Sequence, residues 1–511
     1  MLPITVVLII LICISYIYLN YHRRRSKIIN NVLPGPRTLP VIGNAYCLFR
    51  RSPNEILNIL TKWAEDYPSP FQIWMGNKLF IFVNESDQIK TILQNNQNIC
   101  LNKSKIYNFF KPLLGKGILT ALGLDWYAQR KLISPIFSKT NLLRFFDIFV
   151  EQSLTLTDEL ENVRLNNNKI VFFEYISKCT LDTACVALMD VKVNSLKISQ
   201  FLETMTRLKI IVTSRAKNLF LYPDFIFNLT SARKKCHRDI NFIHIFIDEI
   251  IKANKTRELI VRNRGKTFYD ILMGVPRREN YMYDDFTKIF NNNILFMLLA
   301  ASETTAITLN FVIFILANFP ETQEKVYKEL REIYGIKAPK STRIKYEDLQ
   351  RMNYLENVIK ETLRLFPVGP LIARELTEDI NIRYQTREII LPKDADVVIQ
   401  IMTAQRNKKY WPNPLVFDPD RFLPENIRKS DSFYMPFSLG SRNCMGEKYA
   451  MILMKVFLST LVRTFVFKID ESIQIDQIDL HYNLLLNFAK PIKIRIEKRD
   501  LHEVSKMRAI F

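Results

Sequence analysis

The chain has 511 residues, of which 48% are hydrophobic, and a formal net charge of +21 at pH 7. This composition excludes a disordered or fibrous protein and is sufficient for a large buried core. The basic residues are scattered and accompany no nucleic-acid-binding motif, so a solvated basic surface and no nucleic-acid partner are expected. The 7 cysteines show no CxxC spacing, which argues against a zinc site or a disulfide framework.

The N-terminal segment predicts a membrane anchor. Residues 2–19 contain no charged side chain, and at about 1.5 Å per residue such a helix is near the minimum for a bilayer span. A basic flank from Arg23 to Lys27 follows and orients the rest of the chain towards the cytoplasm. A cleaved signal peptide is the alternative, but it would carry its positive charge before the apolar run. The expected organisation is an anchor helix over 1–21, a basic and Pro-rich hinge over 22–40, and a single domain over 41–511.

The body of the chain reads as mainly helical with a minor β region. Short strand-like runs occur at 71–83 and 380–401, where β-branched and aromatic residues gather between turn residues. Apolar residues at helical spacing dominate from about 119 to 330, and 284–317 predicts one long, strongly apolar helix. The expected fold class is therefore α+β in one large domain.

Three polar residues interrupt the long apolar helix, namely Glu303, Thr304 and Thr305. Polar groups inside an apolar helix are costly unless they are satisfied or functional. One interpretation is structural, with the Thr304 hydroxyl bonded to the carbonyl four residues earlier. The other is that the acid and the alcohol handle protons, and both can hold together.

A short loop near the C-terminus, FSLGSRNCMG at 437–446, separates Cys444 from the other cysteines. A thiolate that binds iron must be deprotonated, shielded and rigidly held. Gly440 and Gly446 permit tight backbone geometry close to a flat cofactor, Phe437 can cover the sulfur, and Arg442 can pair with an acid on the ligand. A buried core thiol is the alternative for any single cysteine.

This loop resembles the haem-binding loop of the cytochromes P-450, whose pattern FxxGxRxCxG it matches at every fixed position. Other segments agree with the resemblance: WYAQR at 126–130, LAASETTA at 299–306, ETLR at 361–364 and FDPDRF at 417–422. The resemblance covers the chain from Pro34 onward and implies the triangular, helix-rich P-450 domain. It also implies haem b as the cofactor.

The resemblance assigns a role to each matching residue. Cys444 would be the axial iron ligand, and Glu303 with Thr304 would deliver protons to bound dioxygen. Glu361, Arg364 and Arg421 would form a buried network beneath the cysteine loop. The cofactor-binding residues would be Trp126, Arg130, Arg374, Phe437, Gly440, Arg442 and Gly446. Ala301 replaces the usual Gly, and Ala300 lacks the carboxylate that forms an ester link to haem in some relatives.

The clan that the sequence most resembles is the microsomal one, which contains the fatty-acid ω-hydroxylases and many insect members. Gln405, Asp394 and Lys408 depart from its usual residues. Residues expected to face the substrate are Tyr107, Phe109, Phe110, Phe296, Ala300, Val368, Leu371 and Leu485, for each of which ordinary core packing is the alternative. An apolar pocket implies an apolar substrate, such as a fatty acid, a hormone-like lipid or a xenobiotic.

The expected activity is insertion of one oxygen atom from O2 into such a substrate. The chain has no dinucleotide-binding glycine fingerprint, so electrons from NADPH would arrive through a separate reductase, with cytochrome b5 as a further donor. Arg130, Lys131 and Lys448 are the basic residues expected to dock it. The expected location is the endoplasmic reticulum membrane, with the domain on the cytosolic face. Two alternatives stay open: reductase-independent rearrangement or dehydration of an oxygenated lipid, and a non-catalytic haem- or ligand-binding protein.

Overall fold

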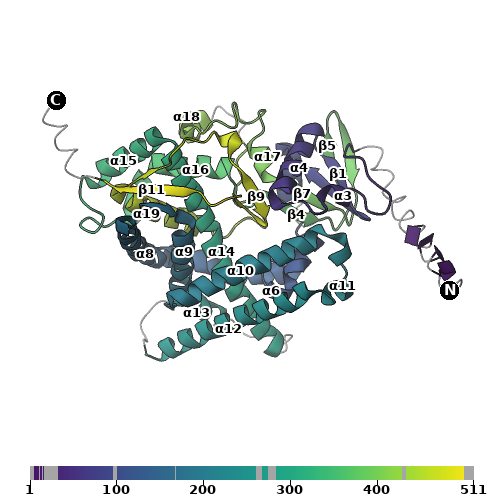
Figure 1. Ribbon diagram of the computed structural model, residues 1–511, viewed down its shortest axis with the longest axis horizontal. Coiled ribbons are helices and arrows are strands. Elements are labelled where there is room, and N and C mark those ends of the chain that lie inside the picture. The colour runs from purple at the N-terminus through teal and green to yellow at the C-terminus, as the bar shows by residue number, and fades with distance from the viewer. Residues whose placement is uncertain are drawn as a thin grey trace.

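The structure is a computed structural model that describes 33–95, 100–166, 168–260, 267–273, 283–427 and 433–499, with short stretches between 5 and 16. Helices predominate and strands form a minor part, which confirms the expected mainly α, α+β class. Figure 1 shows the largest sheet at the end of the molecule nearer the N-terminus and most helices beyond it. The basic flank at 23–27 and most of the hinge lie outside the described residues.

The long helix α14 (Tyr283–Asn318) runs through the core, as its apolar sequence predicts. All its residues from Thr305 to Asn318 are buried, and it packs most closely on α9 (Phe172–Met189). Phe311 of α14 contacts the Phe366 and Phe488 rings, with centroids 4.7 and 4.5 Å away. Three segments far apart in sequence are thereby joined around one helix.

The other helices enclose this core. Local signals set their ends, as in α4, where Pro53 follows an N-cap Ser52 that forms a capping box with Glu55. The remaining α-helices are α3 (Ala45–Leu48), α4 (Pro53–Asp66), α5 (Ser86–Lys90), α6 (Lys111–Leu114), α7 (Gly123–Ile133), α8 (Lys139–Asn166), α10 (Ser195–Lys217), α11 (Asp224–Asn228), α12 (Ser231–Ile260), α13 (Phe268–Met273), α15 (Pro320–Tyr334), α16 (Asn353–Leu365), α17 (Ile401–Gln405), α18 (Pro424–Ile427) and α19 (Glu447–Thr464). Short helices are η1 (Thr91–Asn95), η2 (Lys105–Phe110), η3 (Ser134–Phe137), η4 (Leu219–Leu221), η5 (Tyr346–Arg351), η6 (Pro419–Phe422) and η7 (Ile475–Gln477).

The strands form small sheets, and both predicted strand regions are confirmed. The largest sheet has the order β1-β2-β7-β4, with β1 (Phe71–Met75), β2 (Lys78–Val83), β7 (Asp396–Gln400) and β4 (Leu371–Glu375). Only the β2–β7 pair is parallel, and β7 is buried on both faces. The smaller sheets contain β3 (Lys169–Val171), β11 (Lys493–Lys498) and β8 (Phe465–Lys468), then β5 (Ile380–Tyr384) with β6 (Arg387–Leu391), and β9 (Leu480–Asn483) with β10 (Leu485–Phe488).

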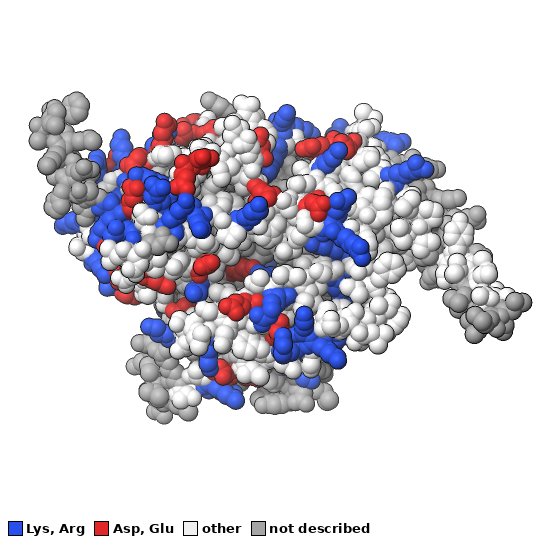
Figure 2. Space-filling model, viewed as in Figure 1, with Lys and Arg blue, Asp and Glu red and all other residues white. Residues whose placement is uncertain are grey.

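Within the described residues, one segment, Thr287–Asn318, is long and apolar enough to cross a bilayer. Since 72% of its most apolar window is buried inside the protein, it is the core helix described above. The described residues between Thr5 and Tyr16 are helical and exposed, and the membrane anchor stays a prediction. Figure 2 shows basic and acidic groups interspersed over one face, with few charges over α11.

Candidate functional site

The loop that carries Cys444 is held by its own backbone and by a neighbouring segment. The Cys444 amide donates to the Phe437 carbonyl at 2.9 Å, which closes the loop. At Gly440, φ is +76° and a Cβ atom would collide with the Leu93 carbonyl oxygen, so only glycine fits. Gly446 has an ordinary φ of −87° and precedes α19, and its role close to the cofactor stays a prediction.

The Cys444 thiol lies at the N-terminal end of α19. Burial raises its pKa, whereas the Gly446 amide and the charge of Arg130 act in the opposite direction. The side chain is nevertheless accessible, so a ligand can reach the sulfur. Because the net shift favours the thiol, the surrounding donors do not by themselves make a thiolate, and a coordinated metal ion would.

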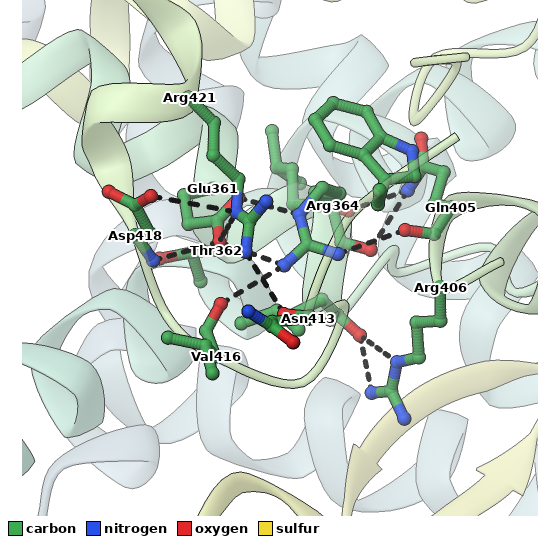
Figure 3. A network of polar contacts seen from close by, with 12 residues as sticks. Glu361, Thr362, Arg364, Gln405, Arg406, Asn413, Val416, Asp418 and Arg421 are labelled. Atoms are coloured by element: carbon green, nitrogen blue, oxygen red, sulfur yellow. Dashed lines mark hydrogen bonds and ion pairs between the residues drawn. The ribbon is translucent and has the colours of Figure 1, made fainter. Parts of the chain in front are cut away.

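Beneath this loop, Glu361 and Arg364 form a fully buried ion pair on α16 (Figure 3). Arg364 Nε donates to Glu361 Oε2 at 2.6 Å, and Arg364 Nη2 donates to Oε1 at 2.8 Å. Arg421 Nε lies 3.4 Å from the same Oε1, and the Asp418 amide donates to it at 3.0 Å. The predicted scaffold residues are therefore in contact with one another.

Gln405, which departs from the usual residue of the clan, connects this network to the cysteine loop. Its Nε2 donates to the carbonyls of Leu363 and Arg364, both at 3.1 Å, and its Oε1 accepts from the Met435 amide at 2.8 Å. Arg364 Nη1 in turn donates to the Gln405 carbonyl at 3.0 Å. The side-chain amide of Gln405 has both a donor and an acceptor, so it can make all these hydrogen bonds. It therefore joins the Arg364 network to the segment that leads into the cysteine loop.

On another side of the cysteine loop, cations gather without counter-ions. Arg442 lies 4.4 Å over the Trp126 ring, Arg374 is 1% exposed, and Lys103 pairs with Arg374 in a β-bridge. Burial lowers the pKa of all three, that of Arg442 to about 9, and their mutual repulsion lowers the pKa of Lys103 and Arg442 further. In the described part of the chain none of them pairs with a carboxylate, and Arg374 Nη2 and Arg442 Nε have no hydrogen-bond partner.

This cluster fits a ligand that carries two carboxylates, because buried cations without partners are costly unless an anion completes them. A haem has two propionates, so the residues fit that group. The predicted contact of Arg130 with a propionate stays a prediction, and the structure shows a second set of contacts for this residue. Its terminal nitrogens donate to the Asn443 carbonyl at 2.7 Å and to Asn443 Oδ1 at 2.6 Å, so it supports the cysteine loop.

One face of α14 is only half-buried, although the helix crosses the core. Phe296, Ala300, Glu303 and Thr304 share this face at helical spacing. The Thr304 hydroxyl donates to the Ala300 carbonyl at 2.7 Å, which confirms the structural interpretation of that residue. Glu303 forms an ion pair with Lys209 of α10, a partner that the sequence did not indicate.

The residues expected to face a substrate come from four segments. Tyr107, Phe109 and Phe110 lie on η2, and the Leu486 amide beside Leu485 donates to the Val368 carbonyl at 2.9 Å. Phe110, Phe296, Val368 and Leu485 belong to the main apolar cluster, whereas Tyr107 and Leu371 pack with the sheet. Phe109 makes separate contacts. The centroid of its ring lies 5.1 Å from the Tyr222 ring centroid and 5.1 Å from the Arg215 guanidinium carbon.

A cavity of about 630 Å³ lies on the outer side of the cysteine loop. Phe437, Glu447 and Lys448 line it, together with Lys139 and Lys360. The described histidines, cysteines and acids form no cluster that could hold a metal ion, so Cys444 would be the single protein ligand of an iron here.

Comparisons with known proteins agree with this geometry. The family model described as Cytochrome P450 matches residues 33–496. Cytochrome P450 4c3 of Drosophila melanogaster is 30% identical over 98% of this chain and 95% of its own length. Cytochrome P450 4c21 of Blattella germanica is 30% identical over 98% and 99%, and cytochrome P450 4V2 of Homo sapiens is 29% identical over 91% and 90%.

These matches, with the buried scaffold and the cysteine loop, define a haem-dependent monooxygenase, an oxidoreductase that uses O2. The chain belongs to the cytochrome P450 family.

Proposed function

We propose that this enzyme hydroxylates an apolar, lipid-like substrate, with electrons that pass from NADPH through a separate reductase. One observation supports the proposal most strongly. The accessible Cys444 lies beside a buried cation cluster that contains no acid and includes the unpaired Arg374 Nη2. Together they offer a thiolate for an iron and partners for two carboxylates, which is the pattern of a haem b site.

A haem held here supplies a thiolate-ligated iron that can activate dioxygen. In this assignment Cys444 ligates the iron, and Trp126, Arg374, Arg442 and Lys103 hold the carboxylates. No ester link is expected at Ala300, because it has no carboxylate.

Glu303 and Thr304 would manage the protons of the reaction. One oxygen atom enters a C–H bond of the substrate and the other leaves as water, which consumes two electrons and two protons. The Glu303 carboxylate can take up protons from solvent, because its side chain is 19% exposed. The Thr304 hydroxyl already donates to Ala300, so its oxygen is left to accept a hydrogen bond from an incoming group.

The test measures haem ligation and product formation in the full chain. We expect the ferrous wild type to give the carbon monoxide spectrum of a thiolate-ligated haem, and Cys444→Ala to lose that band. With reductase, NADPH and a panel of fatty acids, hormone-like lipids and xenobiotics, at least one hydroxylated product should form. Product from a lipid hydroperoxide without NADPH or reductase would contradict the proposal and favour rearrangement.

We propose that the reductase docks beside the cysteine loop, on Lys131 and Lys448. Both lysines are exposed, and Lys448 lines the cavity there. Arg130 is a poorer candidate than the sequence suggested, because its guanidinium is bound to Asn443. Lys131→Glu with Lys448→Glu should raise the reductase concentration needed for half-maximal turnover, whereas Lys234→Glu on α12 should not. An equal effect of the Lys131→Glu/Lys448→Glu double variant and the Lys234→Glu control would contradict the proposed docking site.

We also propose that the N-terminal segment anchors the enzyme in the endoplasmic reticulum membrane. Exposed apolar residues of the domain support this, with Phe220 at 69%, Phe225 at 70% and Leu229 at 87% exposure. Leu219, the neighbour of Phe220, and the carbonyl of Val41 both lie beside Gly76, so the start of this patch is near the segment that follows the hinge. The full chain in microsomes should resist carbonate extraction, and protease added outside should digest its C-terminal domain. Protection of that domain would contradict the orientation.

A further inference from the structure

Lys209 and Glu303 join two helices that are remote in sequence. Lys209 lies on α10 and Glu303 on the half-buried face of α14, and the lysine ammonium donates to Glu303 Oε1. Each side chain is 19% exposed. At this depth the attraction between the two charges is less screened than on an open surface, and loss of either partner leaves a partly buried charge alone.

In the described part of the chain, Lys209 is the one side chain that holds the Glu303 carboxylate in place. The neighbouring hydroxyls do not donate to it, because Thr304 and Thr305 donate to the carbonyls of Ala300 and Ala301. Without Lys209 the carboxylate would therefore have several rotamers of similar energy.

The same helix also holds the segment expected to face the substrate. Near the C-terminal end of α10, Arg215 donates to the carbonyls of Leu221 and Tyr222 at 2.9 and 3.0 Å. Its guanidinium lies 5.1 Å from the Phe109 ring centroid, and Phe109 also contacts the Tyr222 ring. A displacement of α10 would therefore move Phe109 and release Glu303 together.

We propose that Lys209 is a positioning residue, which orients Glu303 and couples the position of α10 to proton supply. This rests on the proposed monooxygenase function. With α10 in place, the Glu303 carboxylate is fixed on the face of α14 that it shares with Thr304. With α10 displaced, the carboxylate is free and protons arrive out of step with electrons, so reduced oxygen leaves as hydrogen peroxide instead of entering the substrate.

The experiment compares Lys209→Met with Lys209→Arg, and uses Lys197→Met as a matched control. Lys197 is on the same helix and pairs with Glu249 at 2.7 Å, but that pair is about half exposed. With reductase and a substrate from the panel, Lys209→Met should raise the ratio of peroxide to product about tenfold, which is less than the roughly 10²–10⁴-fold contribution of a positioned acid–base group because Glu303 itself is retained. Lys209→Arg should stay within about twofold of the wild type, because it retains the cation, and Lys197→Met should match the wild type.

A second measurement needs no turnover. Hydrogen–deuterium exchange in the peptide that covers α10 should become faster in both Lys209→Met and Glu303→Gln, but not in Lys197→Met. The double variant Lys209→Met/Glu303→Gln should add nothing to the single variants, since both remove the same contact. Additive exchange rates, or a Lys209→Met protein that matches Lys197→Met in peroxide and exchange, would overturn the proposal. If the wild type oxidises no compound, the monooxygenase proposal fails and exchange still decides whether Lys209 holds Glu303.

Discussion

Two groups of buried or half-buried arginines lie near the cysteine loop, and they differ in whether an acid of the chain balances their charge. Arg364 and Arg421 share the carboxylate of Glu361 as their counter-ion, and each also donates to a backbone carbonyl. Arg374 and Arg442 have no acid beside them and keep unpaired nitrogens. The first group has a carboxylate of the chain as its counter-ion, so it stabilises the fold, whereas the second has none and needs an external anion.

The difference also shows how a fold can separate structural charge from ligand charge. In the register of the sheet, Asp396 of β7 lies opposite Glu375 of β4. Arg374 of β4 lies opposite Val397. Successive residues of a strand point to opposite faces, so the sheet itself keeps Asp396 away from Arg374. The cation cluster therefore stays available to a ligand.

The strongest test of the comparison is Glu361→Gln. It removes the anion that Arg364 and Arg421 share in a site with 0% exposure for Glu361 and Arg364. Loss of one partner from a buried pair costs about 3–5 kcal/mol, so we expect little folded, haem-loaded protein. Haem content per polypeptide and the thermal midpoint measure the effect. Glu332→Gln, at an exposed position on α15, should leave both unchanged.

Arg442→Met should affect the haem-free and the haem-loaded protein in opposite ways. Burial and the neighbouring Arg374 and Arg130 lower the pKa of Arg442 to about 9, so its folded-state pKa lies below the unfolded value of 12.5. At neutral pH the side chain is charged in both states, and the folded chain without an anion carries the cost of burying that charge. This cost is relieved only as the pH rises past about 9.

We therefore expect the haem-free Arg442→Met protein to be at least as stable as the wild type, while the loaded variant loses haem faster. Transfer of haem to an acceptor protein and thermal unfolding of both forms measure this. Arg364→Met is the matched change in the group that Glu361 balances and should destabilise both forms. Equal loss of stability by both variants in the haem-free state would remove the distinction between the groups.

Much of this site could be predicted from sequence because its residues occur in short motifs of fixed spacing. Cys444, Glu361, Arg364 and Arg421 belong to this class. The ion pair of Lys209 with Glu303 joins positions 94 residues apart, and no local pattern marks it. Lys103 was missed for the same reason, since its role depends on the register of an isolated bridge to Arg374.

Lys103→Met tests whether this lysine belongs to the cation cluster. The pKa of Lys103 is lowered well below its usual value, first by burial and then by Arg374 and Arg442. Its loss leaves the arginines in place, so we expect faster haem loss by roughly fivefold, or about 1 kcal/mol. Lys105→Met is the control, because this exposed neighbour pairs with Glu375 at 2.5 Å and lies outside the cluster. Equal haem loss from both variants would exclude Lys103 from the site.

Asp396→Asn should change stability least among these variants. It tests what the buried carboxylate that the sheet separates from the cation cluster contributes to stability. Burial raises the pKa of Asp396 from 3.8 to about 6, and its Oδ1 has no hydrogen-bond partner. Because the folded-state pKa is raised, the protonated side chain favours folding at low pH, and this contribution is lost as the pH rises through about 6. The variant should therefore be more stable than the wild type at pH 8 and indistinguishable near pH 4. We expect a gain below about 1 kcal/mol, since a buried amide also needs partners. An equal gain in stability at both pH values would show that packing, and not the charge of the buried carboxylate, causes the stabilisation.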